Sequence, residues 1–333
     1  MSDHASVRPL TVGFDIGGTN LRGAVVTDEG TIIDSEQIPT PASSHALEDG
    51  VVQIVRHLQR RHHIAAVGMA VAGFLTPDCR TVRYAPHLPW RDAKVVDRLE
   101  ERLRLPVRLE HDANSAAWGE YRYGSANDEN SWVLFAIGTG IGGTLMVNGE
   151  IYRGAYGTAP EFGHICVVPD GRQCSCGKRG CLERYCSGTA MATTAREMIG
   201  SHTDLDSDLL RDYRTRPDEI TGRHVSLAAR EGDPLAKLVV DDFGLWLGRG
   251  LAMVQDFFDP SLIVIGGGVS TDSDLFMSRA LRAYADNVVG AGHRPLAEIK
   301  TATLGAEAGM IGVADLARDS FKESHAYSLV LDI

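Results

Sequence analysis

The chain has few of the features that mark membrane, secreted or nucleic-acid-binding proteins. None of its apolar runs approaches the roughly 20 residues needed to cross a bilayer. Its first ten residues, MSDHASVRPL, lack the regions of a secretory signal. Basic residues are in deficit, with 33 Lys and Arg against 44 Asp and Glu and a formal net charge of -11. We therefore expect a cytoplasmic protein with neither membrane nor nucleic-acid partners.

Cysteine is also scarce, with six residues in 333, yet three of them lie within eight positions. With one upstream histidine they form a set of three thiolates and one imidazole, which suits tetrahedral zinc. The set is His164, Cys174, Cys176 and Cys181. Four protein ligands leave no open position, so the pattern predicts structural zinc. The other cysteines are interpreted as small buried residues, although Cys166 or Cys186 could replace the histidine.

Two common nucleotide motifs are missing or out of context. No G-x-x-x-x-G-K-[ST] occurs, which excludes a P-loop enzyme. Gly138, Gly140 and Gly143 satisfy G-x-G-x-x-G, the fingerprint of dinucleotide-binding dehydrogenases. That fingerprint must open a helix, whereas here the chain runs into the hairpin dipeptide Asn148-Gly149. The sequence does not favour a dehydrogenase.

The sequence does contain alternating strand and helix patterns in two related halves. Residues 10–38 read as a three-stranded meander, followed by alternating helices and strands. The segment FDIGGTNLRGAVV in the first half matches FAIGTGIGGTLMV in the second, which indicates an internal duplication. We expect two α/β lobes facing a cleft, with a polar junction near residue 123. A helix over Glu307–Ala317 and a loosely attached tail over 319–333 are expected to end the chain.

Three glycine-rich turns are candidates for holding phosphate or a nucleoside. They are Asp15 to Asn20, Gly138 to Gly140 and Gly266 to Gly268. Glycine lets a phosphate approach the backbone, and the neighbouring hydroxyl and amide groups are donors. Each turn alone also fits an ordinary tight turn. Together, and in this order, they predict a nucleotide site.

Asp112 is the candidate catalytic acid or base. It follows the predicted strand at 106–110 and begins a predicted helix. Its carboxylate is therefore expected at the carboxyl end of a sheet, where α/β proteins bind ligands. The same position also suits a helix N-cap, a structural role that aspartate often fills.

Six segments in succession resemble the signatures of the ROK family, which comprises bacterial sugar kinases and repressors of the actin and hexokinase superfamily. They extend from residue 15 to about residue 310, nearly the whole chain. The segments are DIGGTN (15–20), HDANSAAWGE (111–120), IGTGIGG (137–143), YRGAYGTAPEFGHI (152–165), CSCGKRGCLE (174–183) and IGGGVS (265–270). Among family members, the sequence is most similar to ATP-dependent glucose kinases.

The resemblance implies an α/β fold of two ribonuclease-H-like lobes with a cleft between them. The small lobe would span 1–123, completed by a C-terminal helix at about 306–333. The larger lobe would span 124–305 and carry a zinc loop at 164–181. The implied reaction is phosphorylation of the glucose 6-hydroxyl with ATP and Mg²⁺, in a homo-oligomer. The alternatives are a kinase for another hexose or N-acetylhexosamine, or a sugar-sensing regulator. Only 14 residues precede Asp15, so the DNA-binding domain that regulators of the family carry ahead of this loop is not expected.

The resemblance also implies individual roles. Asp112 would be the general base, and Asp15 would lie near the magnesium of MgATP. The sugar-binding set is Gly73, His87, His111, Asp112, Glu161, His164 and Glu183. The nucleotide-binding set is Asp15, Gly17, Gly18, Thr19, Asn20, Gly138, Thr139, Gly140, Gly266, Gly267 and Gly268. His87 and His111 stand where many relatives carry asparagine.

Overall fold

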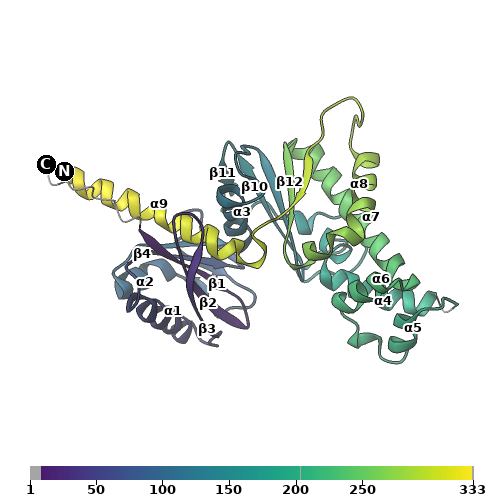
Figure 1. Cartoon of the computed structure of the whole chain (residues 1–333), viewed down its shortest axis with the longest axis horizontal. Helices are drawn as coiled ribbons and strands as arrows, with labels where there is room; N and C mark the ends of the chain where they lie inside the picture. The colour runs from purple at the N-terminus through teal and green to yellow at the C-terminus, as the bar shows by residue number, and fades with distance from the viewer. Residues whose placement is uncertain (1–8, 203, 332–333) are drawn as a thin grey trace. The chain divides into compact units, whose positions relative to one another are not determined.

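The computed structural model describes residues 9–202 and 204–331, and it contains two compact units (Figure 1). Unit 1 comprises the chain up to Glu129, the segment 149–160 and the chain from Thr303 onward. Unit 2 comprises Asn130–Asn148 and Glu161–Ala302. The sequence prediction differed by ending the first lobe at residue 123 and assigning 149–160 to the second. Within unit 1, Arg153 of segment 149–160 pairs with the buried carboxylate of Glu110, while strand β11 (Glu150–Tyr152) of the same segment joins the second sheet.

Unit 1 is built around a five-stranded sheet with the order β3-β2-β1-β4-β8. The first three strands form an antiparallel meander, and β1, β4 and β8 run parallel. The elements are β1 (Leu10–Ile16), β2 (Asn20–Val26), β3 (Ile32–Pro39), α1 (Ser44–Gln59), β4 (Ile64–Val71), α2 (Val95–Leu103), β8 (Val107–His111), α3 (Asp112–Tyr123) and α9 (Ala308–Leu331). A small second sheet consists of β5 (Phe74–Leu75), β6 (Val82–Tyr84) and β7 (Arg91–Ala93).

Helix α9 packs closely on the sheet of unit 1. Gly13 in β1 and Gly68 in β4 are register partners that face this helix. A Cβ atom at either glycine would lie 2.0 Å from a backbone carbonyl oxygen of α9, belonging to Met310 or Val313. Only glycine therefore permits this approach. Apolar side chains of α1 and α2 join those of the strands in the main core of the unit, which includes Phe14 and Ile54.

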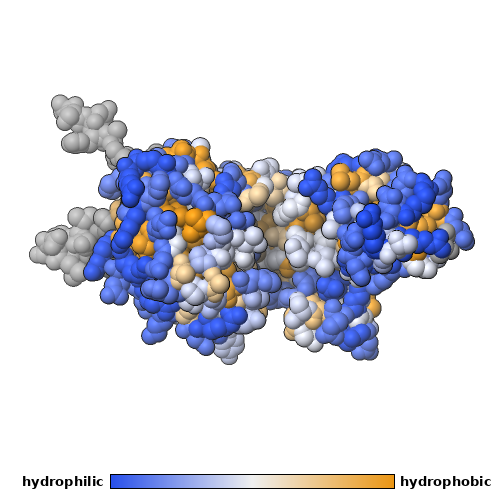
Figure 2. All heavy atoms as spheres, turned by 90° about the horizontal axis from the view of Figure 1, so that it is seen from below, coloured by the Kyte–Doolittle hydropathy of each residue, from blue (hydrophilic) through white to orange (hydrophobic). Residues whose placement is uncertain are grey.

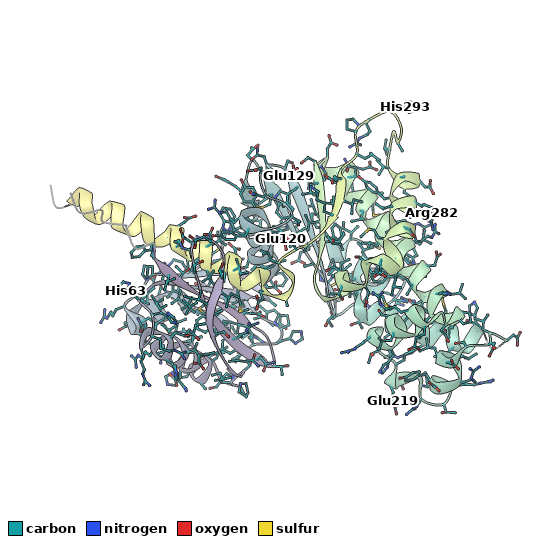
Figure 3. The ribbon with its side chains drawn as sticks, viewed as in Figure 1. His63, Glu120, Glu129, Glu219, Arg282 and His293 are labelled. Atoms are coloured by element: carbon teal, nitrogen blue, oxygen red, sulfur yellow. The ribbon has the colours of Figure 1, made fainter. Side chains whose placement is uncertain are left out.

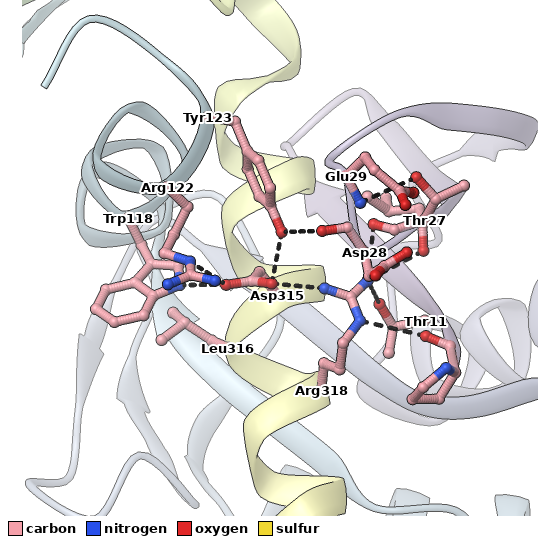
Figure 4. A network of polar contacts seen from close by, with 12 residues as sticks. Thr11, Thr27, Asp28, Glu29, Trp118, Arg122, Tyr123, Asp315, Leu316 and Arg318 are labelled. Atoms are coloured by element: carbon pink, nitrogen blue, oxygen red, sulfur yellow. Dashed lines mark hydrogen bonds and ion pairs between the residues drawn. The ribbon is translucent and has the colours of Figure 1, made fainter. Parts of the chain in front are cut away.

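A buried polar network fastens α9 to its neighbours (Figure 4). The carboxylate of Asp315 accepts hydrogen bonds from Trp118 Nε1 at 2.9 Å, the Tyr123 hydroxyl at 2.7 Å and Arg318 Nη1 at 2.5 Å. Arg318 Nη2 also donates to Thr11 Oγ1 at 3.0 Å, which links the helix to β1. Burial and the hydrogen bond to Asp315 raise the pKa of Tyr123, so its phenol stays a donor.

The C-terminal segment is more regular than expected. A loose tail was predicted from residue 319, whereas α9 continues to Leu331. No glycine or proline follows Ala317 before that point, so nothing in the local sequence ends the helix. The tail prediction was wrong for residues 319–331, where the structure has instead the C-terminal helix that the family resemblance implied, and residues 332–333 lie outside the described part of the chain.

Unit 2 repeats the topology of unit 1. The second sheet has the order β11-β10-β9-β12-β13, in which β9, β12 and β13 run parallel. Its strands are β9 (Trp132–Ile137), β10 (Ile141–Val147), β11 (Glu150–Tyr152), β12 (Leu262–Gly266) and β13 (Glu298–Thr301). The helices are α4 (Gly188–Ser201), α5 (Asp208–Tyr213), α6 (Gly222–Glu231), α7 (Pro234–Phe258) and α8 (Ser273–Asn287). The equal strand orders are those that an internal duplication predicts, and the α/β fold class is confirmed.

Apolar residues are scattered rather than banded over the surface that Figure 2 shows, where orange patches alternate with hydrophilic side chains. Within the described residues, none of the helices combines the length and hydropathy required to cross a bilayer.

Candidate active site

The predicted acids of unit 1 lie at one edge of its sheet. Because β1, β4 and β8 are parallel and in register, Ile16, Val71 and His111 are neighbours at the carboxyl ends of the strands. Asp15 precedes this row and Asp112 follows it directly. The loop after β1 and the start of α3 therefore meet at the edge where parallel sheets bind ligands.

The charge of Asp112 acts on the Asp15 carboxylate. Loss of surrounding water and then the negative charge of Asp112 raise the pKa of Asp15, while the charge of Arg22 opposes the shift. Carboxylates whose charges repel favour a cation beside them. Such a pair is suited to a reaction in which one acid lies near a divalent metal and the other accepts a proton.

Asp112 is the first residue of α3, and the N-cap position belongs to His111. The N-cap interpretation of Asp112 is therefore wrong by one residue. The Asp112 side chain is 48% exposed, so a ligand can reach it, and His111 Nδ1 lies 3.3 Å from its Oδ1. Its charge is favourable at the positive end of the helix dipole.

The loop after β1 and the predicted sugar residues of unit 1 are brought together in part. Gly18 lies against the exposed His87, since a Cβ atom on Gly18 would be 3.1 Å from His87 Cβ. Gly73 follows β4 at the same sheet edge, and a Cβ there would be 2.7 Å from the Tyr84 carbonyl oxygen. Thr19 and Asn20 are exposed at the turn into β2.

The four predicted zinc ligands of unit 2 converge. The ligand atoms of His164, Cys174, Cys176 and Cys181 all lie within 4.8 Å of one another. The Cys176 and Cys181 sulfurs are 3.6 Å apart, and Cys174 Sγ lies 3.6 Å from His164 Nδ1. Zinc–sulfur bonds of about 2.3 Å in a tetrahedron place two sulfurs about 3.8 Å apart, so the spacing fits a zinc ion.

The alternative ligands take other positions. Cys166 Sγ lies 3.6 Å from the Arg179 carbonyl oxygen, and the buried Cys186 Sγ lies 3.7 Å from that of Leu182. Neither belongs to the convergent group. Of the possibilities that the sequence left open, His164 is the fourth ligand that the geometry supports.

His164 connects the thiol group to the two predicted sugar acids. Its Nδ1 faces the thiols and lies 3.8 Å from Glu183 Oε1, while its Nε2 lies 3.9 Å from Glu161 Oε2. Cys174 donates to Glu183 Oε1 at 3.0 Å. Burial and this carboxylate raise the pKa of Cys174 to about 12. Glu183 also touches the second glycine turn, because a Cβ on Gly140 would be 2.5 Å from its Oε2.

A cavity of about 850 Å³ opens in unit 2, and all its lining residues belong to that unit. Gly138 and Thr139 form part of its wall, beside the N-terminus of α4, where the Gly188 N–H donates to the Gly138 carbonyl at 2.8 Å. Gly268 lines it from the third turn. The other lining residues are Thr189, Met191, Ala192, Arg196, Ile220, Thr221, Gly222, Arg223, Ser226, Leu227, Val269, Thr271 and Asp272.

The sequence analysis predicted only some of the residues that line the cavity of unit 2. Gly266 ends the buried strand β12, and Gly267 packs against β9, so neither belongs to the cavity lining. The residues at the starts of α4 and α6 were missed. Ser187-Gly188-Thr189 at a predicted helix start could have pointed to a phosphate site, because helix N-termini bind anions. The α6 segment carries no comparable signal.

Comparisons with known proteins agree on one family. The ROK family profile matches residues 11–320. Glucokinase of Streptomyces coelicolor is 40% identical over 310 residues, covering 93% of this chain and 98% of the relative. The crystal structure of a ROK family glucokinase from Streptomyces griseus, in complex with glucose and AMPPNP, is 39% identical, with a TM-score of 0.81 over 93% of this chain and 99% of that one. The ROK hexokinase of Thermus thermophilus is 30% identical, with a TM-score of 0.79 over 94% and 99%.

Proposed function

This chain belongs to the ROK family, and we propose that it transfers the terminal phosphoryl group of ATP to the 6-hydroxyl of glucose. The relatives above are named for glucose, and one of them holds glucose with an ATP analogue. The observation that carries the proposal is the placement of Asp15 and Asp112 at one sheet edge. In the proposal one of these acids lies near the metal and the other is the base, the two carboxylate roles that phosphoryl transfer to an alcohol requires.

Asp112 acts as the general base in this proposal. Its half-exposed carboxylate accepts the proton of the sugar hydroxyl as the oxygen attacks the terminal phosphorus. Asp15 lies near the magnesium of MgATP, and that ion neutralises phosphate charge when bound. The pKa of Asp15 is raised in the free protein, so a nearby cation stabilises its ionised form.

The cavity of unit 2 supports a nucleotide as the phosphoryl donor. Its apolar side chains, among them Met191, Ile220 and Leu227, suit an adenine base, while backbone groups at Gly138 and Thr139 suit phosphates. Inorganic polyphosphate has no base to fill the apolar part. The lining therefore favours ATP over polyphosphate.

Glu161, His164 and Glu183 are proposed as the sugar-binding groups of unit 2. Paired carboxylates are suitable acceptors for sugar hydroxyls. A zinc ion held by His164 Nδ1 and three thiolates would fix the loop that carries them, because a metal-bound histidine is oriented through its other nitrogen. Here that nitrogen faces Glu161.

The first test compares two aspartates, each in the first turn of a helix. Asp112→Asn removes the proposed base, whereas Asp97→Asn changes the corresponding region of α2. We expect Asp112→Asn to lower kcat by about 10²–10⁴-fold. Asp97→Asn should retain near wild-type turnover, and both variants should keep the wild-type circular dichroism spectrum. ADP release with glucose is measured in a coupled assay, and substantial turnover by Asp112→Asn would refute the base assignment.

Sugar preference is tested in the same assay with glucose, mannose and N-acetylglucosamine at equal concentrations. We expect the largest kcat/KM with glucose. A larger value for another sugar would replace glucose in the proposal and leave the kinase class intact. ATP and polyphosphate are compared as donors, and the proposal expects activity with ATP.

A further inference from the structure

A buried ion pair lies directly beside the proposed base. Glu110 is the penultimate residue of β8, two positions before Asp112, and is only 1% exposed. Its partner, Arg153, comes from segment 149–160 of unit 1. Arg153 Nη2 pairs with Glu110 Oε2, and Arg153 Nε lies 3.4 Å from Oε1. Two nitrogens of one guanidinium therefore contact both oxygens of one carboxylate.

Further donors complete the surroundings of the Glu110 carboxylate. The His111 backbone N–H donates to Oε1 at 3.1 Å, and Asn114 Nδ2 donates to the same oxygen at 3.0 Å. Arg108 Nη2 lies 3.4 Å from Oε2. Burial opposes ionisation of Glu110, yet the charge and hydrogen bonds of Arg153, with Asn114 and Arg108, hold the pKa of Glu110 below its ordinary value. The pair is therefore charged at neutral pH.

These contacts fix the backbone on both sides of the base. His111 immediately precedes Asp112 and Asn114 follows it by two positions, and both donate to the same Glu110 oxygen. The first turn of α3 is thereby held to the end of β8. A shift of this turn would move the Asp112 carboxylate, and misplacement by about 1 Å can cost about 10²-fold in rate.

The other member of the pair fixes a second segment. Arg153 Nη1 donates to the Ile151 carbonyl at 3.2 Å, and the Arg153 carbonyl accepts from the Ala159 N–H at 3.2 Å. The turn between these residues is thus tied to the arginine that Glu110 holds. The chain continues from it directly into Glu161, a proposed sugar ligand.

We propose that Glu110 and Arg153 are positioning residues for the phosphoryl transfer, holding both the turn that carries Asp112 and the segment that leads to Glu161. The inference rests on the proposed function, because it takes Asp112 as the base. A buried ion pair gives little net stability compared with apolar residues of similar size. The geometry points instead to an orienting role, which the pair performs without touching the substrates.

The test separates stability from turnover by a double-mutant cycle. Glu110→Gln leaves the part-buried Arg153 charge without its carboxylate, and Arg153→Met leaves the buried Glu110 with only the longer Arg108 contact, so each should lower the melting temperature. The double variant Glu110→Gln/Arg153→Met removes both charges and should recover most of the melting temperature. Its kcat/KM for glucose should nonetheless remain about 10–10²-fold below wild type. Its KM for ATP should be unchanged, because every lining residue of the proposed nucleotide cavity belongs to unit 2.

The matched control is another buried carboxylate in unit 1. Glu48 of α1 is 3% exposed and pairs with Arg98 of α2, with Nη2 and Oε1 2.6 Å apart. The double variant Glu48→Gln/Arg98→Met should keep wild-type kcat/KM for glucose. Arg153→Lys, which retains the charge and loses the two-nitrogen contact, is measured as a milder variant. It should fold normally and show a smaller loss of kcat/KM.

Two outcomes would overturn the inference. One is wild-type kcat/KM for glucose in the Glu110→Gln/Arg153→Met variant. If that double variant does not fold, wild-type kcat/KM in Arg153→Lys has the same meaning. The other is a control variant that loses as much kcat/KM as the pair. Asp112→Asn is assayed alongside. If Asp112→Asn is inactive and the Glu110→Gln/Arg153→Met variant has wild-type kcat/KM, only the positioning role is refuted. If Asp112→Asn is active, the proposed base and this inference are refuted together.

Discussion

Two glycines in the zinc loop have similar backbone angles but different surroundings. Gly177 and Gly180 have φ angles of +93° and +76°, which side-chain-bearing residues rarely adopt. A Cβ at Gly177 would meet nothing within 4 Å, whereas one at Gly180 would lie 1.7 Å from the Val168 carbonyl oxygen. The same substitution therefore adds a clash only at Gly180.

We predict that Gly177→Ala costs about 1–2 kcal/mol of local stability and leaves zinc content unchanged. Gly180→Ala should lower zinc content as well, because the clash displaces the neighbouring ligand Cys181. Zinc per chain is measured by atomic emission and stability by thermal unfolding. Equal zinc content in the two variants would contradict this prediction.

Single residues also show what the sequence could and could not establish. The zinc set was predictable because the spacing of Cys174, Cys176 and Cys181 within one loop limits how far apart their sulfurs can lie. The cavity wall was not, because Met191, Leu227 and Val269 are ordinary apolar residues whose meeting depends on how α4, α6 and the third glycine turn pack.

At the scale of elements, the long strands followed from periodicity, as in the meander predicted over residues 10–38, where the structure has β1, β2 and β3. The short strands could not be predicted from the sequence pattern. Strands β5, β6 and β7 have two or three residues each, too few for an alternating pattern to be visible. They depend on pairing with one another, which the local sequence does not encode.

The zinc loop is the element whose contribution to sugar binding can be tested directly. Cys176→Ser removes one proposed ligand, and Cys166→Ser changes an exposed thiol of the same segment that lies outside the ligand group. We predict zinc loss and weaker glucose binding for Cys176→Ser, because Glu183 and Glu161 both lie near His164. Cys166→Ser should match wild type.

Isothermal titration with glucose and metal analysis measure the two effects. Unchanged glucose affinity in zinc-free Cys176→Ser protein would show that the loop holds its acids without the ion. Removal of zinc from the wild-type protein by a chelator should reproduce the Cys176→Ser result.

On the scale of the whole molecule, one carboxylate of unit 1 binds the chain near the first and the last of the four connections between the units. Glu120, labelled in Figure 3, is buried near the end of α3. It accepts from the Ser125 N–H at 2.8 Å, close to where the chain leaves unit 1, and from the Leu304 N–H at 2.8 Å, just after the chain returns. Thr303 also donates to it through its N–H, at 3.0 Å.

Unit 1 is therefore not contained in any continuous N-terminal fragment. We predict that a fragment of residues 1–129 does not fold, because without α9 the faces of β1 and β4 that carry Gly13 and Gly68 are uncovered. The same fragment joined through a flexible linker to residues 303–333 should regain helical structure and a cooperative thermal transition. Circular dichroism measures both. A cooperative transition in the shorter fragment would contradict the prediction.

The position of α9 also affects how the protein is made. Domains generally fold as units while the ribosome synthesises them from the N-terminus. Here the sheet that is translated first obtains helix α9 only after all of unit 2 has been made, since residues 308–331 follow that unit in the sequence. Unit 2 can therefore fold completely before helix α9 of unit 1 has been synthesised. The nascent chain must therefore keep an incomplete first sheet from aggregating throughout the synthesis of the second unit.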